Sequence, residues 1–428
     1  ILEHSVGMVA GAVSLIRRCG TRRALLELAC ERVKGSRLAS TAASSRRTLL
    51  GLGQEELRDL SAELTFPEWR GTQIHDAIYG DMRKTSIDGM QQLPLSFRQA
   101  LVDAGYETGR REPLEIVADE EDGTKKALFE LWCGSIIEAV GIPGERAKGG
   151  PKDSVEGSLY EDGDELQEEE DDTRGRRRRF TVCVSSQVGC AMRCSFCATG
   201  RQGFRRNLTS DEIVNQVLAM EDVFGRRATN VVMMGMGEPL LNLREVLRAH
   251  RCLNRDVGIG GRHFTISTVG VPNALSKLAA HRLQATLAVS LHAPTQELRE
   301  RLIPSAKAYP LDALLNDVRN YKKATGRRVT FEYTLLAGEN DSPEHARALA
   351  KLLRSKVGRG CHINLLPWNP VAGTSHTRPS RSAVHRFCDA LAKESGVSHT
   401  IRATRGLEAS AACGQLTGSF ERKVSARA

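Results

Sequence analysis

The densest group of reactive side chains in the sequence is a run of cysteines with the spacing C-x3-C-x2-C, at Cys190, Cys194 and Cys197. Three thiolates on one short loop can bind three irons of a [4Fe-4S] cluster and leave the fourth iron open. An open iron is what the binding and reductive cleavage of S-adenosylmethionine require. Zinc is the alternative, but a structural zinc site takes four ligands, typically as paired C-x2-C halves. No second Cys or His pair stands nearby, so the spacing favours an iron–sulfur cluster.

The segment that begins at Phe180 alternates strand-like and helix-like patterns, and the cysteine run follows its first strand. Repeated strand–helix units predict a parallel sheet with helices outside it, and six strands predict an incomplete barrel. In such barrels the chemistry lies at the C-terminal ends of the strands. The expected strands are Thr181–Ser185, Asn230–Met234, His263–Ser267, Thr286–Leu291, Val329–Leu335 and His362–Leu366. The expected helices include Ser210–Phe224, Leu243–Cys252, Leu311–Ala324 and Pro343–Leu353.

The residues before this barrel predict a small accessory domain. Helical patterns follow Pro67 and span Leu93–Leu101, and two strand-like runs, Ala127–Trp132 and Ser135–Ile142, flank a turn at Cys133-Gly134. We expect the chain to divide into a leader (1–48), the accessory domain (49–144), a charged insertion (145–179), the barrel (180–416) and a C-terminal tail (417–428).

Two of these segments are set apart by composition. The leader is rich in Arg, Ala, Ser and Leu and poor in acids, which is typical of an organelle transit peptide; a native helical extension is the alternative. The insertion joins an acidic run, 161–172, to an arginine run, 176–179. Low hydrophobicity and opposed blocks of charge predict a disordered, solvated loop. From the leader we expect the protein to work in a plastid or mitochondrion.

The composition of the whole chain limits the classes of protein that it can belong to. Its 428 residues are 40% apolar and 26% charged, which is typical of a globular protein of two or three domains. No run approaches the roughly 18 apolar residues of a membrane span, so we expect no membrane association. Eleven cysteines in a chain of this length favour a metal site in a reducing compartment over a disulfide scaffold. The formal net charge of +9 suits a polyanionic partner such as RNA.

Several motifs, taken in order along the chain, resemble one family. The cysteine run looks like that of radical SAM enzymes, and its wider context resembles the RlmN/Cfr RNA methyltransferases from about Pro67 to Leu416. The motifs that carry the resemblance are Cys183-Val-Ser-Ser-Gln-Val-Gly-Cys190, Met233-Met-Gly-Met-Gly-Glu-Pro-Leu240, Ser290-Leu-His-Ala-Pro294, Pro367-Trp-Asn-Pro370 and Ala411-Ala-Cys-Gly-Gln415. The leader and the insertion lie outside it.

The resemblance implies a fold and a reaction. The fold would be a partial (β/α)6 radical SAM barrel in the α/β class, with a small N-terminal accessory domain. RlmN-type enzymes methylate C2 of an adenine in large-subunit ribosomal RNA and in certain tRNAs, and they use two S-adenosylmethionine molecules per turnover. In the family scheme, one molecule methylates a cysteine, and the other is cleaved by the cluster to give a radical that activates this methyl group. The activated carbon adds to the base, and a second cysteine releases the product as a disulfide forms.

The resemblance also assigns residues to these steps. Cys413 resembles the methyl-carrying cysteine, Cys183 the cysteine that resolves the protein–RNA adduct, and Glu138 the acceptor of the ring proton. The expected contacts to S-adenosylmethionine are Gly237, Glu238, Ser267, Ser290, Leu291, His292 and Asn369. The chain departs from the family pattern at Leu407-Glu408-Ala409-Ser410, which leaves the positioning of the C-terminal loop open.

Two other functions remain possible at this point. The first is methylation of adenine C8, as in the Cfr branch, and the second is a non-enzymatic RNA-binding protein with a structural metal. For the favoured reaction we expect ribosomal RNA and tRNA as partners, an electron donor for the cluster, and a monomeric enzyme.

Overall fold

The structure is a computed structural model that describes residues 47–81, 83–144, 178–394 and 397–418. Nearly all of the expected leader and insertion, and most of the expected C-terminal tail, lie outside these ranges. Within them, no helix combines the length and the apolar character needed to cross a bilayer.

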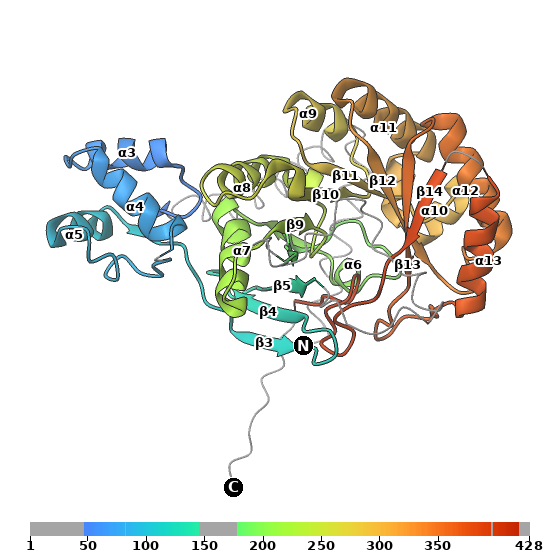
Figure 1. The fold of residues 1–428 in the computed structure, drawn as a ribbon, viewed down its shortest axis with the longest axis horizontal. Coiled ribbons are helices and arrows are strands. Elements are labelled where there is room, and N and C mark those ends of the chain that lie inside the picture. The colour runs from blue at the N-terminus through green and yellow to red at the C-terminus, as the bar shows by residue number, and fades with distance from the viewer. Residues whose placement is uncertain (1–46, 82, 145–177, 395–396, 419–428) are drawn as a thin grey trace, which may run out of the picture.

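One ten-stranded sheet organises the described chain (Figure 1). Seven neighbouring strands in it are parallel, and six of these match the strands expected from the sequence, which confirms a partial (β/α)6 barrel. The seventh, β14, escapes the sequence pattern because three polar residues separate its two apolar ends. The parallel strands are, in spatial order, β6 (Phe180–Cys183), β9 (Asn230–Met233), β10 (Phe264–Thr268), β11 (Thr286–Ser290), β12 (Val329–Leu335), β13 (Cys361–Pro367) and β14 (Val397–Ile401).

Helices follow most of these strands and begin and end at clear sequence signals. Thr209 and Glu212 form a capping box at the start of α7, and Gly225 ends that helix in the left-handed conformation at φ 64°. Ser342 caps α12 by accepting a hydrogen bond from the His345 N–H at 3.3 Å. The helices are α7 (Ser210–Phe224), α8 (Leu243–Arg255), α9 (Ala274–Ala280), α10 (Gln296–Leu302), α11 (Leu311–Thr325), α12 (Pro343–Lys356) and α13 (Arg381–Ala392).

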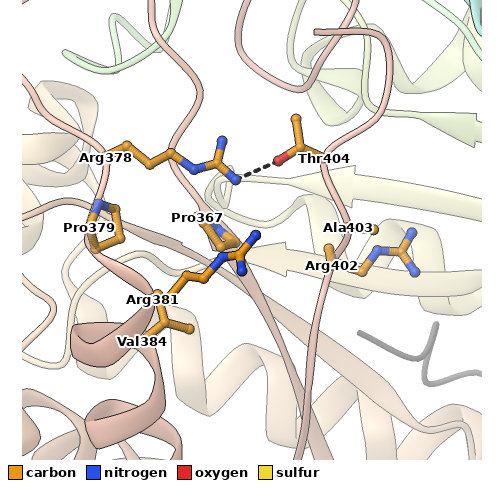
Figure 2. Close-up of a pocket in the computed structure, with 8 residues that line it drawn as sticks. All are labelled: Pro367, Arg378, Pro379, Arg381, Val384, Arg402, Ala403 and Thr404. Atoms are coloured by element: carbon orange, nitrogen blue, oxygen red, sulfur yellow. Dashed lines mark hydrogen bonds between the residues drawn. The ribbon is translucent and has the colours of Figure 1, made fainter. Parts of the chain in front are cut away.

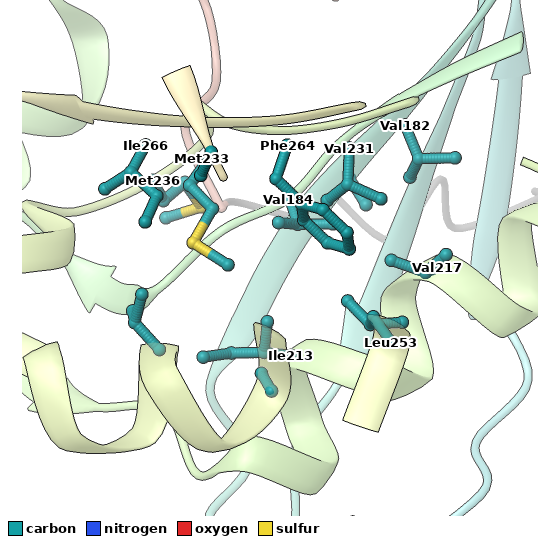
Figure 3. Packing of buried hydrophobic residues seen from close by; sticks show 14 of the residues in the cluster. Val182, Val184, Ile213, Val217, Val231, Met233, Met236, Leu253, Phe264 and Ile266 are labelled. Atoms are coloured by element: carbon teal, nitrogen blue, oxygen red, sulfur yellow. The ribbon is translucent and has the colours of Figure 1, made fainter. Parts of the chain in front are cut away.

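The two faces of the barrel sheet differ in chemistry. Val182, Val231 and Phe264 are register neighbours on the outer face, where they are fully buried against α7 and α8 (Figure 3). Each such side chain contributes roughly 1.5–3 kcal/mol by leaving water. Because side chains alternate along a strand, the next residues point to the inner face. That inner face carries polar and reactive groups, including Cys183 and Ser267.

Three antiparallel strands extend the sheet beyond β6: β5 (Ile136–Pro143), β4 (Lys125–Glu130) and β3 (Glu115–Ala118). The sequence analysis expects the strands of this region in a separate accessory domain. They instead share the barrel sheet, because β5 pairs with the free edge of β6 from Val140↔Cys183 to Pro143↔Phe180. The expected division between residues 144 and 180 therefore falls within one sheet.

The helices of the N-terminal region lie to one side of the barrel (Figure 1). They are α3 (Gln54–Glu63), α4 (Trp69–Tyr79) and α5 (Leu95–Asp103). Gly71 lets α3 and α4 approach closely, since a Cβ there would lie 2.3 Å from the carbonyl oxygen of Leu57. His75 Nε2 lies 3.1 Å from Asp256 Oδ1 at the end of α8, which connects this helical unit to the barrel.

Candidate active site

The three cysteines of the C-x3-C-x2-C run lie on one loop at the base of a short hairpin, formed by β7 (Gln187–Gly189) and β8 (Phe204–Asn207). The Cys190 N–H donates to the carbonyl of Gly203 at 3.0 Å, which closes the loop. Gly189 is required at its start, because its φ is +71° and a Cβ would lie 1.8 Å from the oxygen of Gly203. The loop ends where α6 (Ala198–Gln202) begins, directly after Cys197.

The surroundings of these thiols fit an iron–sulfur cluster. Cys190 and Cys194 are buried, and burial raises the pKa of Cys190 to about 12 and that of Cys194 well above its usual value. The neighbouring thiols raise both values further. Iron binding would displace the protons and replace this mutual repulsion with metal–thiolate bonds.

Arg299 is a charged residue of this site that the sequence analysis missed. Its side chain is only 1% exposed, and it donates to the carbonyl oxygens of Leu291 (3.2 Å) and Val269 (2.6 Å) at the ends of β11 and β10. Burial lowers its pKa to about 10, while its charge acts on the Cys194 thiol. A buried cation beside the thiolates suits a negatively charged cluster. The sequence around Arg299 does not mark it as a site residue, since other charged residues lie close to it on both sides.

Gly237 and Glu238 lie directly beside the cysteine loop, as the sequence predicts. Gly237 has φ +104°, and a Cβ there would lie 2.5 Å from Cβ of Gln187, so the backbone approaches β7 closely. Glu238 is buried, and burial raises its pKa. Its Oε1 accepts from the Leu240 N–H (3.0 Å), and its Oε2 accepts from the Val269 N–H (2.8 Å). Since a carboxylate offers about four acceptor sites, it can also receive an amino group.

Four of the expected cofactor contacts lie at the ends of β10 and β11. Ser267 and Ser290 are neighbours, with their hydroxyl oxygens 3.4 Å apart. Leu291 is fully buried, and its N–H donates to the carbonyl of Glu332 at 3.0 Å. His292 is also buried, with φ 58°; its Nδ1 accepts from the Thr334 N–H at 2.9 Å. Burial lowers the pKa of His292 to about 3, so the ring is neutral and carries its proton on Nε2.

The loop that carries Cys413 is attached to the cysteine loop on one side. The Ala198 N–H donates to the carbonyl of Gly414 at 2.8 Å, and the Thr199 hydroxyl donates to the carbonyl of Leu416 at 2.6 Å. Asn369 is the asparagine of the Pro-Trp-Asn-Pro motif, and its Nδ2 lies 3.4 Å from the Cys413 carbonyl oxygen. These contacts bring three motifs that are far apart in the sequence to one edge of the barrel.

The other side of the Cys413 loop rests on the β3–β4 hairpin. Asp122 Oδ2 accepts from the Gly406 N–H at 2.7 Å, and Asp119 Oδ2 accepts from the Glu408 N–H at 2.9 Å. Lys126 Nζ donates to the carbonyl of Ser410 at 3.2 Å. These anchors bind backbone atoms, so their hydrogen bonds do not depend on the unusual side chains of residues 407–410. The sequence analysis missed these anchoring side chains.

Cys183 and Cys413 are brought together by the fold. Cys183 ends β6 on the inner face, and Cys413 is close enough that the charges of Cys183 and Cys197 act on its thiol. Desolvation by the surrounding protein atoms raises the pKa of each of the two thiols to about 12, and Arg402 opposes this rise at Cys413. Both cysteines are free thiols in the structure, and the Cys413 residue is exposed.

Glu138 shares the inner sheet face with Cys183, because Val140 pairs with Cys183 and residues 138 and 140 point the same way. Glu138 lies within β5, opposite the point where β6 has already ended. It therefore still reaches the mouth of the barrel. Its Oε1 accepts from the Gly418 N–H at 3.0 Å, and Lys126 Nζ lies 3.7 Å from Oε2. Burial raises the pKa of Glu138, and Lys126 opposes this.

Comparison with known proteins places this arrangement in a family. Residues 184–350 match the model of the radical SAM superfamily, whose members use a [4Fe-4S] cluster and S-adenosylmethionine. A protein of Thermosynechococcus vestitus named "Probable dual-specificity RNA methyltransferase RlmN" is 48% identical over 368 residues, which cover 86% of this chain and 97% of that protein. A protein of the same name from Synechocystis sp. is 45% identical over 382 residues, with coverage of 89% and 98%.

A solved structure agrees with these sequence relatives. The crystal structure of a radical SAM methyltransferase from Sphaerobacter thermophilus superposes with a TM-score of 0.73 at 38% identity, and the match covers 87% of this chain and all of that one. Family membership favours an enzyme over a non-catalytic RNA-binding protein, and it gives the protein RNA as its substrate. On this identity and coverage, the chain belongs to the RlmN family of radical SAM RNA methyltransferases.

Proposed function

We propose that the protein methylates C2 of an adenine in large-subunit ribosomal RNA, and that tRNA is a further substrate. The observation that best supports this reaction is the attachment of the Cys413 loop to the cysteine loop, where the Ala198 N–H donates to the Gly414 carbonyl at 2.8 Å, with Cys183 on the inner face of β6. Two thiols next to a radical-generating centre suit a reaction in which one thiol carries the new carbon and the other releases the product.

The chemistry of the target explains why a cysteine must carry the methyl group. Adenine C2 lies between two ring nitrogens and is electron-poor, so it cannot displace a methyl group from a sulfonium. The thiolate of Cys413 can do so. When bound, the cluster and two S-adenosylmethionine molecules per turnover supply the methyl group and the radical that activates it. Cys190, Cys194 and Cys197 would hold the cluster, and the residues at the strand ends would hold the cofactor: Gly237, Glu238, Ser267, Ser290, Leu291, His292 and Asn369.

Two further residues complete the proposed cycle. Glu138 accepts the proton from C2 after the Cys413-bound carbon has added to the base, and the deprotonated adduct gives up its unpaired electron, which the bound cluster would take back. The raised pKa of Glu138 brings its carboxylate closer to the range of a useful general base. The Cys183 thiolate then attacks the sulfur of Cys413. The sulfur–carbon bond breaks, its electron pair stays on the product carbon, which takes a proton, and a Cys183–Cys413 disulfide remains. An external thiol reductant restores both thiols.

Mass spectrometry of nucleosides from treated RNA tests the target atom. We expect 2-methyladenosine from ribosomal RNA and from tRNA that lack the modification. Recovery of 8-methyladenosine instead would place the enzyme in the Cfr branch and overturn the C2 assignment. Separate incubations with each RNA decide between the two substrates.

The cellular context forms a second part of the proposal. The composition of residues 1–48 supports import into a plastid or mitochondrion, where a bacterial-type ribosome would supply the RNA. We further propose that the enzyme works as a monomer and takes electrons from a separate donor. Fusion of residues 1–60 to a fluorescent protein tests the location: an organellar signal is expected, and a diffuse cytosolic signal contradicts the proposal.

A further inference from the structure

A cavity of about 310 Å³ opens at the edge of the barrel where β13 ends (Figure 2). It lies between the end of β13, the first turn of α13 and the segment that follows β14. None of the residues that the structure places around it is acidic, and three are arginines. The lining residues are Pro367, Arg378, Pro379, Arg381, Val384, Arg402, Ala403 and Thr404.

The Arg378 guanidinium is held in place by its neighbours. Its Nη1 donates to Asn369 Oδ1 at 3.0 Å, and its Nη2 donates to Thr404 Oγ1 at 2.9 Å, a bond drawn in Figure 2. Thr404 Oγ1 also lies 3.1 Å from Asn369 Oδ1. A guanidinium fixed in this way loses less entropy when it binds an anion, because its orientation is already set.

Arg381 adds a second positive charge on the opposite wall. It is the first residue of α13, a helix of 12 residues, where unpaired backbone N–H groups already favour an anion. Its side chain extends between Pro367 and the segment that carries Arg402 (Figure 2). Within the described residues its guanidinium forms no ion pair, so it is available to a ligand.

Asn369 connects this cavity to the methyl-carrying residue. Asn369 Oδ1 accepts a hydrogen bond from Arg378, and Asn369 Nδ2 lies 3.4 Å from the Cys413 carbonyl oxygen. A ligand bound to Arg378 is therefore linked to the Cys413 loop through two side chains, those of Arg378 and Asn369. An RNA strand whose adenine reaches Cys413 has its own backbone within a nucleotide or two of that point.

We propose that this arginine-lined cavity binds one backbone phosphate of the substrate RNA, next to the adenosine that is methylated. The proposal rests on the proposed function, since it takes Cys413 as the point where the base is held. Arginine is the side chain whose planar fork matches phosphate oxygens in pairs. The cavity thus fixes the register of the strand relative to Cys413.

The salt dependence of RNA binding gives the first test. Loss of one phosphate contact to a single strand lowers the slope of log Kd against log salt by about 0.7. We expect this change, with weaker binding, in Arg381→Ala, and a partial return of affinity in Arg381→Lys. The control is Arg347→Ala, which removes the same charge from the outer helix α12, where Arg347 pairs with Glu344 at 2.6 Å and is half exposed. We expect wild-type binding in this control.

Neutralised phosphates give the second test. A series of RNA oligonucleotides, each with one methylphosphonate linkage near the target adenosine, is bound to the wild type and to Arg381→Ala. One linkage should weaken binding to the wild type and have no further effect in Arg381→Ala. Equal losses in the two proteins at every linkage, or an Arg381→Ala variant that binds like Arg347→Ala, overturn the proposal. These assays measure RNA binding, so a negative result here can be distinguished from a failure of the proposed C2 methylation. The iron content of each variant verifies that it is folded.

Discussion

At the scale of single residues, the surroundings of the reactive groups favour their uncharged forms. Burial raises the pKa of Cys183 to about 12, desolvation does the same for Cys413, and burial also raises the pKa of Glu138. Each group must lose its proton to act as a nucleophile or base. The positive charges of Lys126 and Arg402 favour the charged forms of Glu138 and Cys413, respectively. Desolvation therefore disfavours the charged form of each group, and the neighbouring cations oppose this effect.

The two remote cysteines should fail in different ways when each is removed. Cys413→Ala leaves no sulfur to accept the methyl group, so RNA methylation and RNA adducts should both fall to background. Cys183→Ala leaves the earlier steps intact, so RNA should stay covalently attached to the protein. Denaturing gel electrophoresis with labelled RNA distinguishes the two. An adduct in Cys413→Ala, or normal turnover in Cys183→Ala, shows that the roles are wrongly assigned.

Glu138→Gln should slow proton removal by roughly 10²–10⁴-fold, the usual contribution of a general base. It should also change the pH dependence of stability. The pKa of Glu138 is raised in the folded state, so its protonated form stabilises the fold below the unfolded pKa, and this contribution is lost as the pH rises through the folded pKa. The glutamine variant cannot ionise and should lack that loss. Single-turnover kinetics and denaturant unfolding between pH 4 and pH 8 measure both effects; an unchanged rate rejects the general-base role.

At the scale of elements, the catalytic loop depends on a hairpin that lies far from it in the sequence. Carboxylates of the β3–β4 turn accept hydrogen bonds from the backbone N–H groups of residues 406 and 408. Ala198 and Thr199 donate hydrogen bonds to the carbonyls of residues 414 and 416. The cysteine loop and the Cys413 loop are thus positioned by different sets of contacts. A change in the hairpin can disturb one loop and leave the other in place.

Asp122→Asn tests whether the cysteine loop and the Cys413 loop are positioned independently. The substitution keeps an acceptor for Thr124, but it can place an NH2 group against the Gly406 N–H, at a cost of about 1–3 kcal/mol for the lost hydrogen bond. RNA methylation should fall by roughly 5- to 100-fold, and cleavage of S-adenosylmethionine should continue. The control, Asp312→Asn, changes an exposed carboxylate on α11 that pairs with Lys356. A parallel loss of both activities in Asp122→Asn argues against separate positioning.

The same elements show how far the sequence could predict the structure. The parallel strands followed from apolar runs at regular intervals, and the cysteine loop followed from spacing, because both are local signals. Strand β14 was missed because Ser398, His399 and Thr400 interrupt its apolar pattern; Ser398 and Thr400 bond to His362 of β13 at 2.9 and 3.0 Å. Arg299 and Asp122 were missed because their partners are backbone atoms of distant segments. Only the folded chain reveals such partners.

At the scale of the whole molecule, one sheet joins the N-terminal strands to the barrel. The two parts are joined by the pairing of β5 with β6. Strand β5 carries Glu138, and strand β6 carries Cys183. The distance between the proposed base and the proposed resolving thiol is therefore fixed by sheet geometry. The insertion enters between these two strands, at the point where the Gly144 N–H donates to the carbonyl of Arg179 at 2.8 Å.

This hydrogen bond predicts that the insertion can be removed without loss of the fold. Because residues 144 and 179 already oppose each other in an antiparallel pair, an Asn-Gly turn in place of residues 145–178 can close the hairpin. A shorter loop should lower the entropic cost of closing the hairpin by about 2 kcal/mol. We expect normal iron content, thermal stability at least equal to the wild type, and RNA methylation within about twofold, since Glu138 and Cys183 keep their register. Methylation that falls while cleavage of S-adenosylmethionine persists would instead assign RNA binding to the removed segment, which includes the arginines at 176–178.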